Sequence, residues 1–492
     1  MTRYQFYPIL AMGAVLLVGG CKVGPDFQHP AAPEVTGYTK DKLPAKTPST
    51  DVQGGEAQNY VQGLDIPGQW WALFRSQPLN RLIEQAMRNN PDLDAARAAL
   101  RAANENVYAE QGVLFPTLSA NGQAARERFA GAQFGQPNLP IPPFSLVTTS
   151  LNISYAPDVF GGIRRQIEQL DAQSEFQRFQ LEASYLTLTA NVVVAAVQEA
   201  SLRQQISATE SIIKLEADQL RVVQNQFTLG GVSKSDVLTQ QATLSATQAT
   251  LPPLQKQLAQ TRNQLTALAG RFPSQEIEET FNLDGLALPT DLPVSLPSAL
   301  VAQRPDVRAA DATLHAASAN IGVATANELP QFTISGQVGS TALSFDKLFS
   351  PGTAVWAIAG SVAQPLFDGG TLLHRKRAAV AQFDEAAAQY RSTVIRAFQN
   401  VADVLRALQS DADALKAQAA AESSAQDSLN LASQQFQLGA ITYLILLNAQ
   451  RTYQQALINL VEAQANRYSD TAGLFQALGG GWWHRPAGTV NE

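Results

Sequence analysis

One helix start occurs twice in this chain: NPDLDAARAAL at residues 90–100 returns as RPDVRAADATL at residues 304–314. A second pair follows in the same order, FTLG at residues 227–230 and FQLG at residues 436–439. The two separations, about 214 and about 209 residues, are nearly equal and approach half of the 492 residues. Two matches in one order at nearly one offset indicate an internal duplication, so we expect one architecture built from two similar halves.

The composition argues against nucleic-acid binding and against catalysis. Only 16% of the residues are charged, and the net charge of −7 comes without a basic stripe that could follow a phosphate backbone. The 4 histidines are scattered and there is 1 cysteine, so no pair has the spacing of metal ligands. We therefore predict no catalytic residue and no metal site, and we do not expect an enzyme.

The amino terminus has the pattern of a lipoprotein signal peptide in residues 1–20. Arg3 is followed by an apolar run too short to span a bilayer, and small residues precede Cys21. We expect removal of residues 1–20 and an N-palmitoyl group and an S-diacylglycerol on Cys21, with no other cofactor. Lys22 stands where an aspartate would favour retention at the inner membrane, so the predicted location is the bacterial outer membrane. Residues 21–77, rich in Pro, Gly and Thr, are predicted to be an extended tether.

Two segments alternate with the period of a β-strand. Around residues 147–155, apolar or β-branched residues alternate with polar ones, and residues 331–365 repeat the pattern. We predict hairpins at 117–157 and 331–365, with an apolar face towards lipid. Four strands cannot close a barrel, and open edges are costly in lipid, so several chains must share one. Two chains would give eight strands with a filled interior, and three would give twelve with room for a pore.

A long helix is predicted after each hairpin, at residues 163–228 and 371–437, with return helices at 234–270 and 442–478. Apolar residues recur every seven positions, as in Ile206, Ile213, Leu220 and Phe227. A sustained seven-residue period indicates antiparallel coiled-coil pairs. The predicted fold is thus mainly α with a small β part, divided into repeat 1 (78–285), repeat 2 (286–480) and a tail (481–492).

Taken in order, five motifs resemble the outer-membrane factor (TolC-like) family, and most closely its NodT-type efflux lipoproteins. They are CKVGPDF (21–27), WWALF (70–74), RPDVR (304–308), PLFDGG (365–370) and LFQALGGGW (474–482). The resemblance implies a homotrimer with a twelve-strand transmembrane barrel and an α-helical barrel. It implies three partners: a periplasmic adaptor (membrane fusion) protein, an inner-membrane transporter of the RND type, and outer-membrane lipid. The implied function is a passive exit duct for drugs or other small molecules.

In this family the helical tips meet the adaptor and close the periplasmic end. The corresponding residues here are Leu229, Gly230, Gly231, Ser235 and Asp236 in the first tip, and Leu438, Gly439, Ile441, Tyr443, Ile445 and Asn448 in the second. Asp236 matches the tip aspartate of the family. The second tip departs from the family pattern, because Ile445 and Asn448 stand where relatives often carry acids and Ile441 where some carry an arginine. We therefore expect an aperture lined by apolar side chains that gates by dewetting.

Two other functions are compatible with the same residues. The duct could serve a type I protein secretion system instead of small-molecule efflux. Alternatively, the chain could be a structural coiled-coil lipoprotein of the envelope, anchored by Cys21 and without a pore. The alternatives differ in the partner of the duct and in whether the four alternating segments enter lipid.

Overall fold

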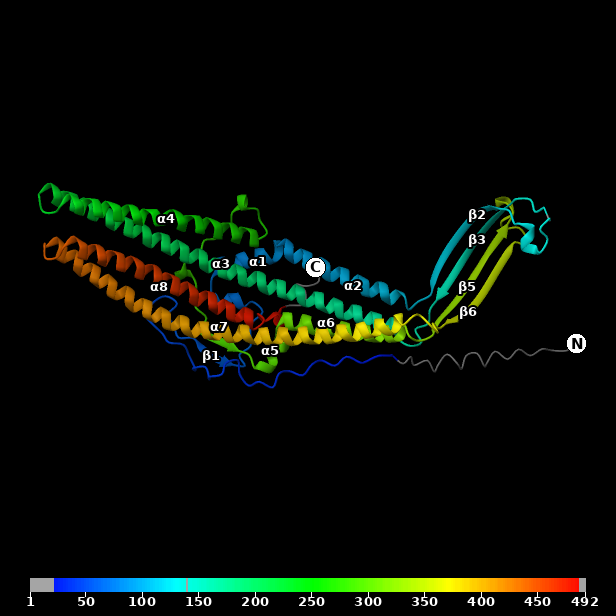
Figure 1. Cartoon of the computed structure of the whole chain (residues 1–492). Helices are drawn as coiled ribbons and strands as arrows, with labels where there is room; N and C mark the ends of the chain where they lie inside the picture. Colours follow the sequence, from blue (N-terminus) through cyan, green and yellow to red (C-terminus); the bar gives the residue numbers. More distant parts are fainter. Residues whose placement is uncertain (1–21, 139, 486–492) are drawn as a thin grey trace. The chain divides into compact units, whose positions relative to one another are not determined.

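The computed structural model describes residues 22–138 and 140–485, which cluster into two compact units. The predicted signal peptide, Cys21 and the end of the predicted tail lie outside the described residues. Unit 1 comprises the described residues up to 30 with Leu100–Gln177 and Ala310–Tyr390, and unit 2 comprises the remainder. The fold is mainly helical with a small β part, as predicted (Figure 1).

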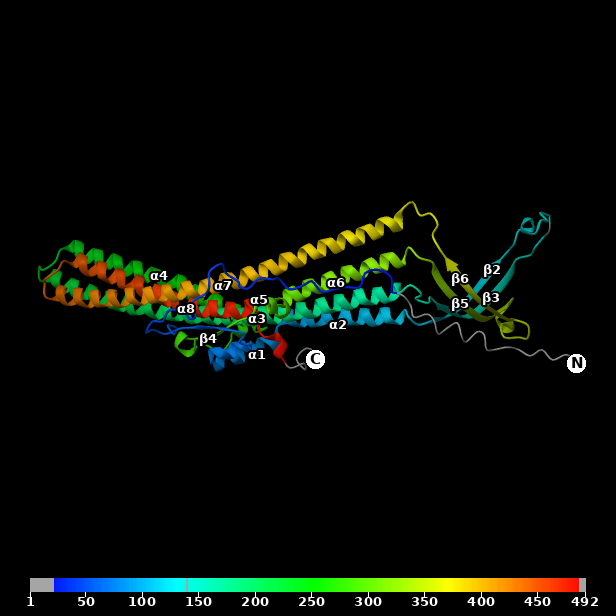
Figure 2. The same ribbon diagram turned by 90° about the horizontal axis from the view of Figure 1, so that it is seen from below.

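Unit 1 contains an antiparallel sheet of four strands in the order β2-β3-β5-β6 (Figures 1 and 2). The strands form two hairpins, β2 (Thr117–Glu127) with β3 (Phe144–Tyr155) and β5 (Gln331–Ala342) with β6 (Ala354–Ala363), joined through β3 and β5. Each hairpin lies in the predicted segment of its repeat. The unit also holds parts of the helices α2 (Pro91–Gly112), α3 (Gly162–Thr228), α6 (Pro305–Ala326) and α7 (Thr371–Gln437).

The register of the sheet separates an apolar face from a polar one. Directly opposed residues of antiparallel strands point to the same side. One face carries the rows Ala120, Leu151, Val338, Trp356 and Leu118, Ile153, Gly336, Ile358. The other face carries the rows Ser119, Asn152, Gln337, Ala357 and Asn121, Ser150, Gly339, Val355. Because Trp356 and Ile358 are 76% and 77% exposed, these two apolar rows are uncovered in the single chain.

Unit 2 is built mainly from helices, with one small parallel sheet. The helices are α1 (Gln77–Asn89), α4 (Lys234–Leu268), α5 (Pro297–Gln303), α8 (Tyr443–Ala477) and the remaining lengths of α2, α3 and α7. The sheet pairs β1 (Asn59–Gln62) with β4 (Asp291–Val294). Short 3-10 turns complete the chain at Trp70–Phe74, Gly131–Phe134, Pro273–Gln275, Leu283–Gly285, Phe345–Lys347 and Trp482–His484.

The duplicated stretch forms a helix start in both repeats. A proline is the first residue of both α2 and α6, where its missing N–H costs nothing and its fixed φ suits the helix. The residue before the proline differs. The side chain of Asn90 accepts from the backbone N–H of Asp92 at 2.9 Å, whereas Arg304 pairs with Asp306 at 2.7 Å and donates to the Ala477 carbonyl at 2.9 Å.

The prediction of an extended tether for residues 21–77 is wrong where the segment packs against the rest of the chain, as it does in its second half. Residues 59–62 form β1, and Trp70 is buried and stacks on Phe475 with 5.4 Å between ring centroids. Gln58 is also buried, and its amide donates to Pro289 O and Thr471 Oγ1, each at 2.9 Å. A strand of 4 residues is too short to show a period, and its partner lies over 200 residues away in the chain.

The seven-residue rows are buried to different degrees in the two halves. Leu408, Leu415, Leu429 and Phe436 of α7 are all buried. The corresponding row of α3 is only half-buried, and Phe227 is 41% exposed. The fully buried row of α3 is instead the neighbouring one: Leu202, Thr209, Glu216 and Val223. The first coiled coil therefore packs through a seam that contains polar residues.

Candidate functional site: helical tips

Both tips in unit 2 use the same turn, which explains the repeated FxLG sequence. At the end of α3, Gly231 N–H donates to Gln226 O at 2.8 Å and Gly230 N–H to Phe227 O at 3.0 Å. At the end of α7, Ala440 N–H donates to Gln435 O at 2.8 Å and Gly439 N–H to Phe436 O at 3.0 Å. This pair of bonds is the Schellman motif, which needs a left-handed residue. Gly230 and Gly439 supply it, with φ of 77° and 70°.

The helices that leave the two tips begin differently. Ser233 and Asp236 form a capping box at the start of α4: Asp236 Oδ2 accepts from Ser233 N–H at 2.8 Å and from Ser233 Oγ at 2.7 Å. At the start of α8, Thr442 makes no side-chain cap and the first turn contains no acidic residue. Asp236 therefore stabilises a helix start, and the second tip lacks a carboxylate at the matching place.

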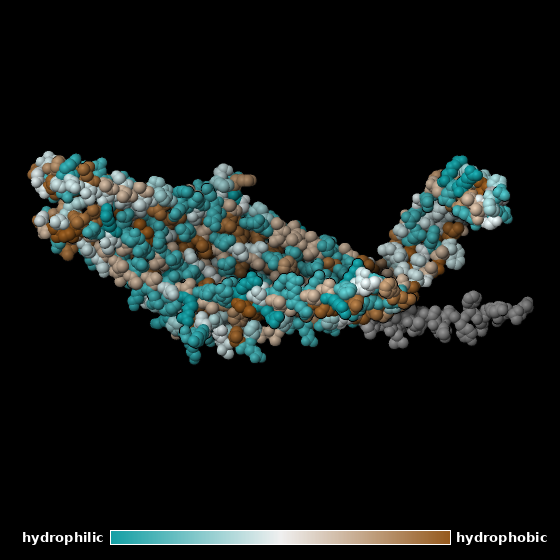
Figure 3. All heavy atoms as spheres, in the orientation of Figure 1, coloured by the Kyte–Doolittle hydropathy of each residue, from teal (hydrophilic) through white to brown (hydrophobic). Residues whose placement is uncertain are grey.

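The predicted tip residues divide into exposed and buried ones. The two leucines that precede the tip glycines, Leu229 and Leu438, are 86% and 83% exposed. Gly230, Gly231, Ser235, Gly439, Ile445 and Asn448 are exposed as well. Ile441 is partly buried against the core of the tips, and Tyr443 is buried within that core, packed edge-on against Phe436. Tyr443 is thus a packing residue, whereas the exposed apolar side chains gather at the turns (Figure 3).

A buried carboxylate lies behind the tips, at a place that we did not predict. Glu216 is 1% exposed, accepts from Thr247 Oγ1 at 3.0 Å, and leaves its second oxygen without a protein partner. Burial raises the pKa of its carboxyl, and the hydrogen bond from Thr247 offsets part of that rise. Glu216 falls in the seven-residue row between Leu202 and Val223, so its position in the period was the available signal.

A second buried polar network in unit 2 joins the amino-terminal segment to α8. Arg467 is 1% exposed, and its Nη2 donates to Glu56 O at 2.8 Å, Gln58 Oε1 at 3.0 Å and Thr47 Oγ1 at 3.4 Å. Asp411 of α7 lies close to Arg467 and Asp470. Burial, and then the hydrogen bond with Asp470, raise the pKa of the Asp411 carboxyl to about 7. Two carboxyl groups that share a site favour one proton between them.

The raised pKa of Asp411 predicts that the protein loses stability as pH rises. The folded state binds a proton more tightly than the unfolded state, so the benefit is complete below pH ~4 and lost by pH ~7. Asp411→Asn should flatten this slope and raise the Tm at pH 8 by about 1 °C, for a screened effect of about 1 kcal/mol in a chain of 492 residues. Thermal unfolding followed by circular dichroism at pH 5 and pH 8 measures the Tm and its dependence on pH. Asp413→Asn, exposed on the same helix, is the control, and an equal flattening there would contradict the prediction.

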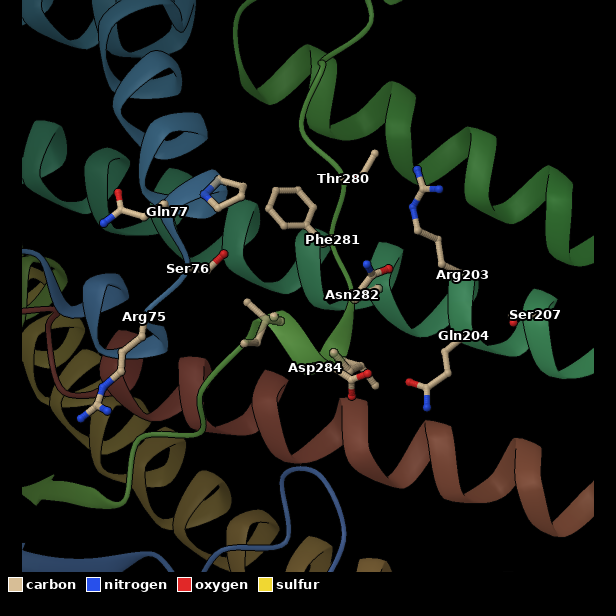
Figure 4. A pocket seen from close by; sticks show the side chains of 15 residues that line it. Arg75, Ser76, Gln77, Arg203, Gln204, Ser207, Thr280, Phe281, Asn282 and Asp284 are labelled. Carbon is tan, nitrogen blue, oxygen red and sulfur yellow. The ribbon is translucent and has the colours of Figure 1, made fainter.

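A surface cavity of about 640 Å³ also lies in unit 2, between the start of α1, α3 and residues 280–286 (Figure 4). Arg203 on its wall pairs with the buried Glu199 at 2.7 Å, and Arg262 binds the same carboxylate at 2.7 Å. Arg262 also donates to the carbonyls of Ile277 and Glu279 at 2.8 and 3.2 Å, so it holds the segment before β4 against α4. Over the described residues, no cluster of His, Cys, Asp and Glu could hold a metal ion, and no helix there is long and apolar enough to span a membrane.

Comparison with known proteins identifies the family. The family model described as outer membrane efflux protein matches residues 82–271 and 296–480, so the chain belongs to that family. It is 29% identical over 486 residues to the probable efflux pump outer membrane protein TtgC of Pseudomonas putida, covering 98% of this chain and 97% of that protein. It is 28% identical to the solvent efflux pump outer membrane protein SrpC of Pseudomonas putida, covering 96% and 98%.

Among solved structures, the outer-membrane channel OprN superposes with a TM-score of 0.83 at 27% identity, covering 94% of this chain and all of that one. The chain is accordingly an outer-membrane channel with a periplasmic helical part, and it is the exit component of an efflux pump. The proteins it resembles are channels and not enzymes.

Proposed function

We propose that three copies of this chain close one twelve-strand barrel through the outer membrane and conduct small molecules out of the periplasm. The observation that carries the proposal is the sheet of unit 1. Its outer strands β2 and β6 are each paired on one side only, and its apolar face exposes Leu118, Trp356 and Ile358. In lipid, open edges must be paired, and another copy offers the complementary edge. The polar face would then line the pore, which suits a water-filled channel.

The tips are the proposed contact with a periplasmic adaptor, and through it with an RND-type transporter of the inner membrane. Leu229 and Leu438 present two nearly identical apolar knobs on rigid turns, so one kind of adaptor surface can fit both. The proposed cargo is small and partly apolar, as with the relatives that export solvents or toluene. We further propose the lipid groups on Cys21, which the CKVGPDF motif supports.

Planar-bilayer recording tests the channel. The purified chain should form a defined conductance, and the residues 131–138 loop should be cut by protease added to whole cells. Expression with a matching adaptor and transporter should restore solvent tolerance to a strain lacking its own outer-membrane channel. If the chain forms no conductance and the loop is not cut, the alternative of a structural lipoprotein without a pore would be favoured. Restored protein secretion without solvent tolerance would indicate the type I system.

The chemistry of the tips predicts an aperture closed by apolar contact. Asp236→Ala should remove one capping interaction, worth about 1 kcal/mol, and leave any cation block of the closed channel unchanged. Ile445→Ser should instead raise the conductance of the closed channel, because a hydroxyl wets a constriction that isoleucine keeps dry. Single-channel recording compares the two variants. Cation block relieved by Asp236→Ala alone would favour a charged gate.

A further inference from the structure

Residues 22–29, which follow Cys21, pack into a site in unit 1 that is lined by specific polar and aromatic contacts. Arg165 lies in the first turn of α3 and is 1% exposed, yet it carries a charge. Its Nε donates to Val23 O at 2.9 Å, and its Nη2 donates to Asp26 Oδ1 at 2.8 Å and to Gly24 O at 3.3 Å. Within its own helix, Nη1 donates to Glu168 at 2.9 Å. A buried guanidinium is costly unless it is paired, and residues 23–26 supply most of the acceptors.

The shape of the site also fits this segment. Gly24 has a φ of 88°, and a Cβ added there would lie 2.5 Å from Gly322 Cα of α6. The segment therefore approaches α6 backbone to backbone, which only glycine allows. Next to it, Phe27 stacks on His315 of α6 with 4.4 Å between ring centroids and an interplanar angle of 11°.

An ion pair fixes one end of the segment, and a histidine–aspartate contact fixes the other. Lys22 Nζ lies 2.9 Å from Glu168 Oε2 of α3, and His29 Nδ1 lies 2.8 Å from Asp311 Oδ2 of α6. A backbone hydrogen bond also holds the segment to the turn between β3 and α3: Val23 N–H donates to Phe160 O at 3.2 Å. Two helices and the turn after β3 thus hold eight consecutive residues.

We propose that Arg165 is the positioning residue of a docking site for residues 22–29, and that docking fixes the amino end of the mature chain at the turn where β3 leads into α3. The occupant is the segment of the same chain. The docking goes beyond the proposed channel function and does not depend on it. Its consequence, a lipid anchor held beside the strands that enter the membrane, rests on the lipidation of Cys21 proposed above.

Cleavage by chymotrypsin after Phe27 in the purified, detergent-solubilised full chain tests the docking. The stacked ring must leave His315 before the bond can enter a protease, so the rate reports the undocked population. Arg165→Gln, Asp26→Asn and Gly24→Ala should each speed this cut by ~10- to 100-fold, the loss expected for a hydrogen bond to a charged group. The control is Lys376→Gln, which removes a surface charge paired with Glu328 in the same unit. This variant should be cut at the wild-type rate.

The double variant Arg165→Gln/Asp26→Asn separates positioning from general loosening. If Arg165 and Asp26 hold the segment through the bond between them, the double variant is cut no faster than the quicker of the two single variants. Wild-type rates in all three single variants, or an equal acceleration in Lys376→Gln, would overturn the proposal. The mass of the released amino-terminal fragment reports its lipid separately, so failure of lipidation and failure of docking are distinguishable.

Discussion

Arginine in place of Ile358 should abolish assembly of the channel in the outer membrane. Ile358 lies in β6 on the apolar face, in a row with Leu118 and Ile153, and its side chain is 77% exposed. A lipid-facing arginine near the middle of a bilayer costs about 2–4 kcal/mol, and a trimer would carry three of them. The measurement is the amount of oligomer in outer-membrane fractions that resists dissociation in detergent without heating, together with solvent tolerance in the complementation assay.

The neighbouring residue provides a matched control. Ala357 lies in the same strand, one residue away, opposite Gln337 on the polar face. Ala357→Arg introduces the same charge and bulk, but towards the proposed aqueous pore, so assembly should persist while conductance changes. Equal loss of oligomer in both variants would show that β6 does not present one face to lipid and the other to water.

The sheet was predictable from the sequence because each of its faces has one environment. Alternation along residues 147–155 and 331–365 reflects an apolar and a polar side, and strands of 10 to 12 residues are long enough to show a period of two. The paired tips were predictable for a related reason. A Schellman turn requires a left-handed residue at one fixed place, so Gly230 and Gly439 appear in both repeats. In both cases the local backbone geometry or the local environment restricts which residue type can stand at a position, so the sequence pattern predicts the structure.

Long-range polar contacts were not predictable in this way. Residues 22–29 and 47–62 looked like a featureless tether, because their partners, such as Arg165 and Arg467, lie more than 100 residues further along the chain. The arginines themselves look like ordinary surface charges of long helices. Tyr443 was assigned to the adaptor contact, but it points into the tip core, because one position along a helix turns a side chain by about 100°.

Replacement of Arg467 by methionine should cause a large loss of stability in unit 2. Methionine keeps most of the volume of the side chain but removes every hydrogen bond to Thr47, Glu56 and Gln58. It also leaves Asp411 without the nearby positive charge. Breaking a buried charged network by removing one member typically costs about 3–5 kcal/mol, which corresponds in a chain of 492 residues to a fall in Tm of roughly 3–5 °C.

The pH of the measurement separates the two parts of this loss. At pH 5 the Asp411 carboxyl, with its pKa raised to about 7, is largely protonated, so Arg467→Met should cost mainly its hydrogen bonds. At pH 8 the carboxylate is charged and unpaired, so the loss should be larger, and Asp411→Asn added to Arg467→Met should recover that difference. Arg406→Met is the control, since Arg406 pairs with Asp41 at 3.2 Å on the surface and such pairs contribute about 0–1 kcal/mol. An equal loss in the control, or a double variant no more stable at pH 8 than Arg467→Met, would mean that Arg467 acts through packing alone.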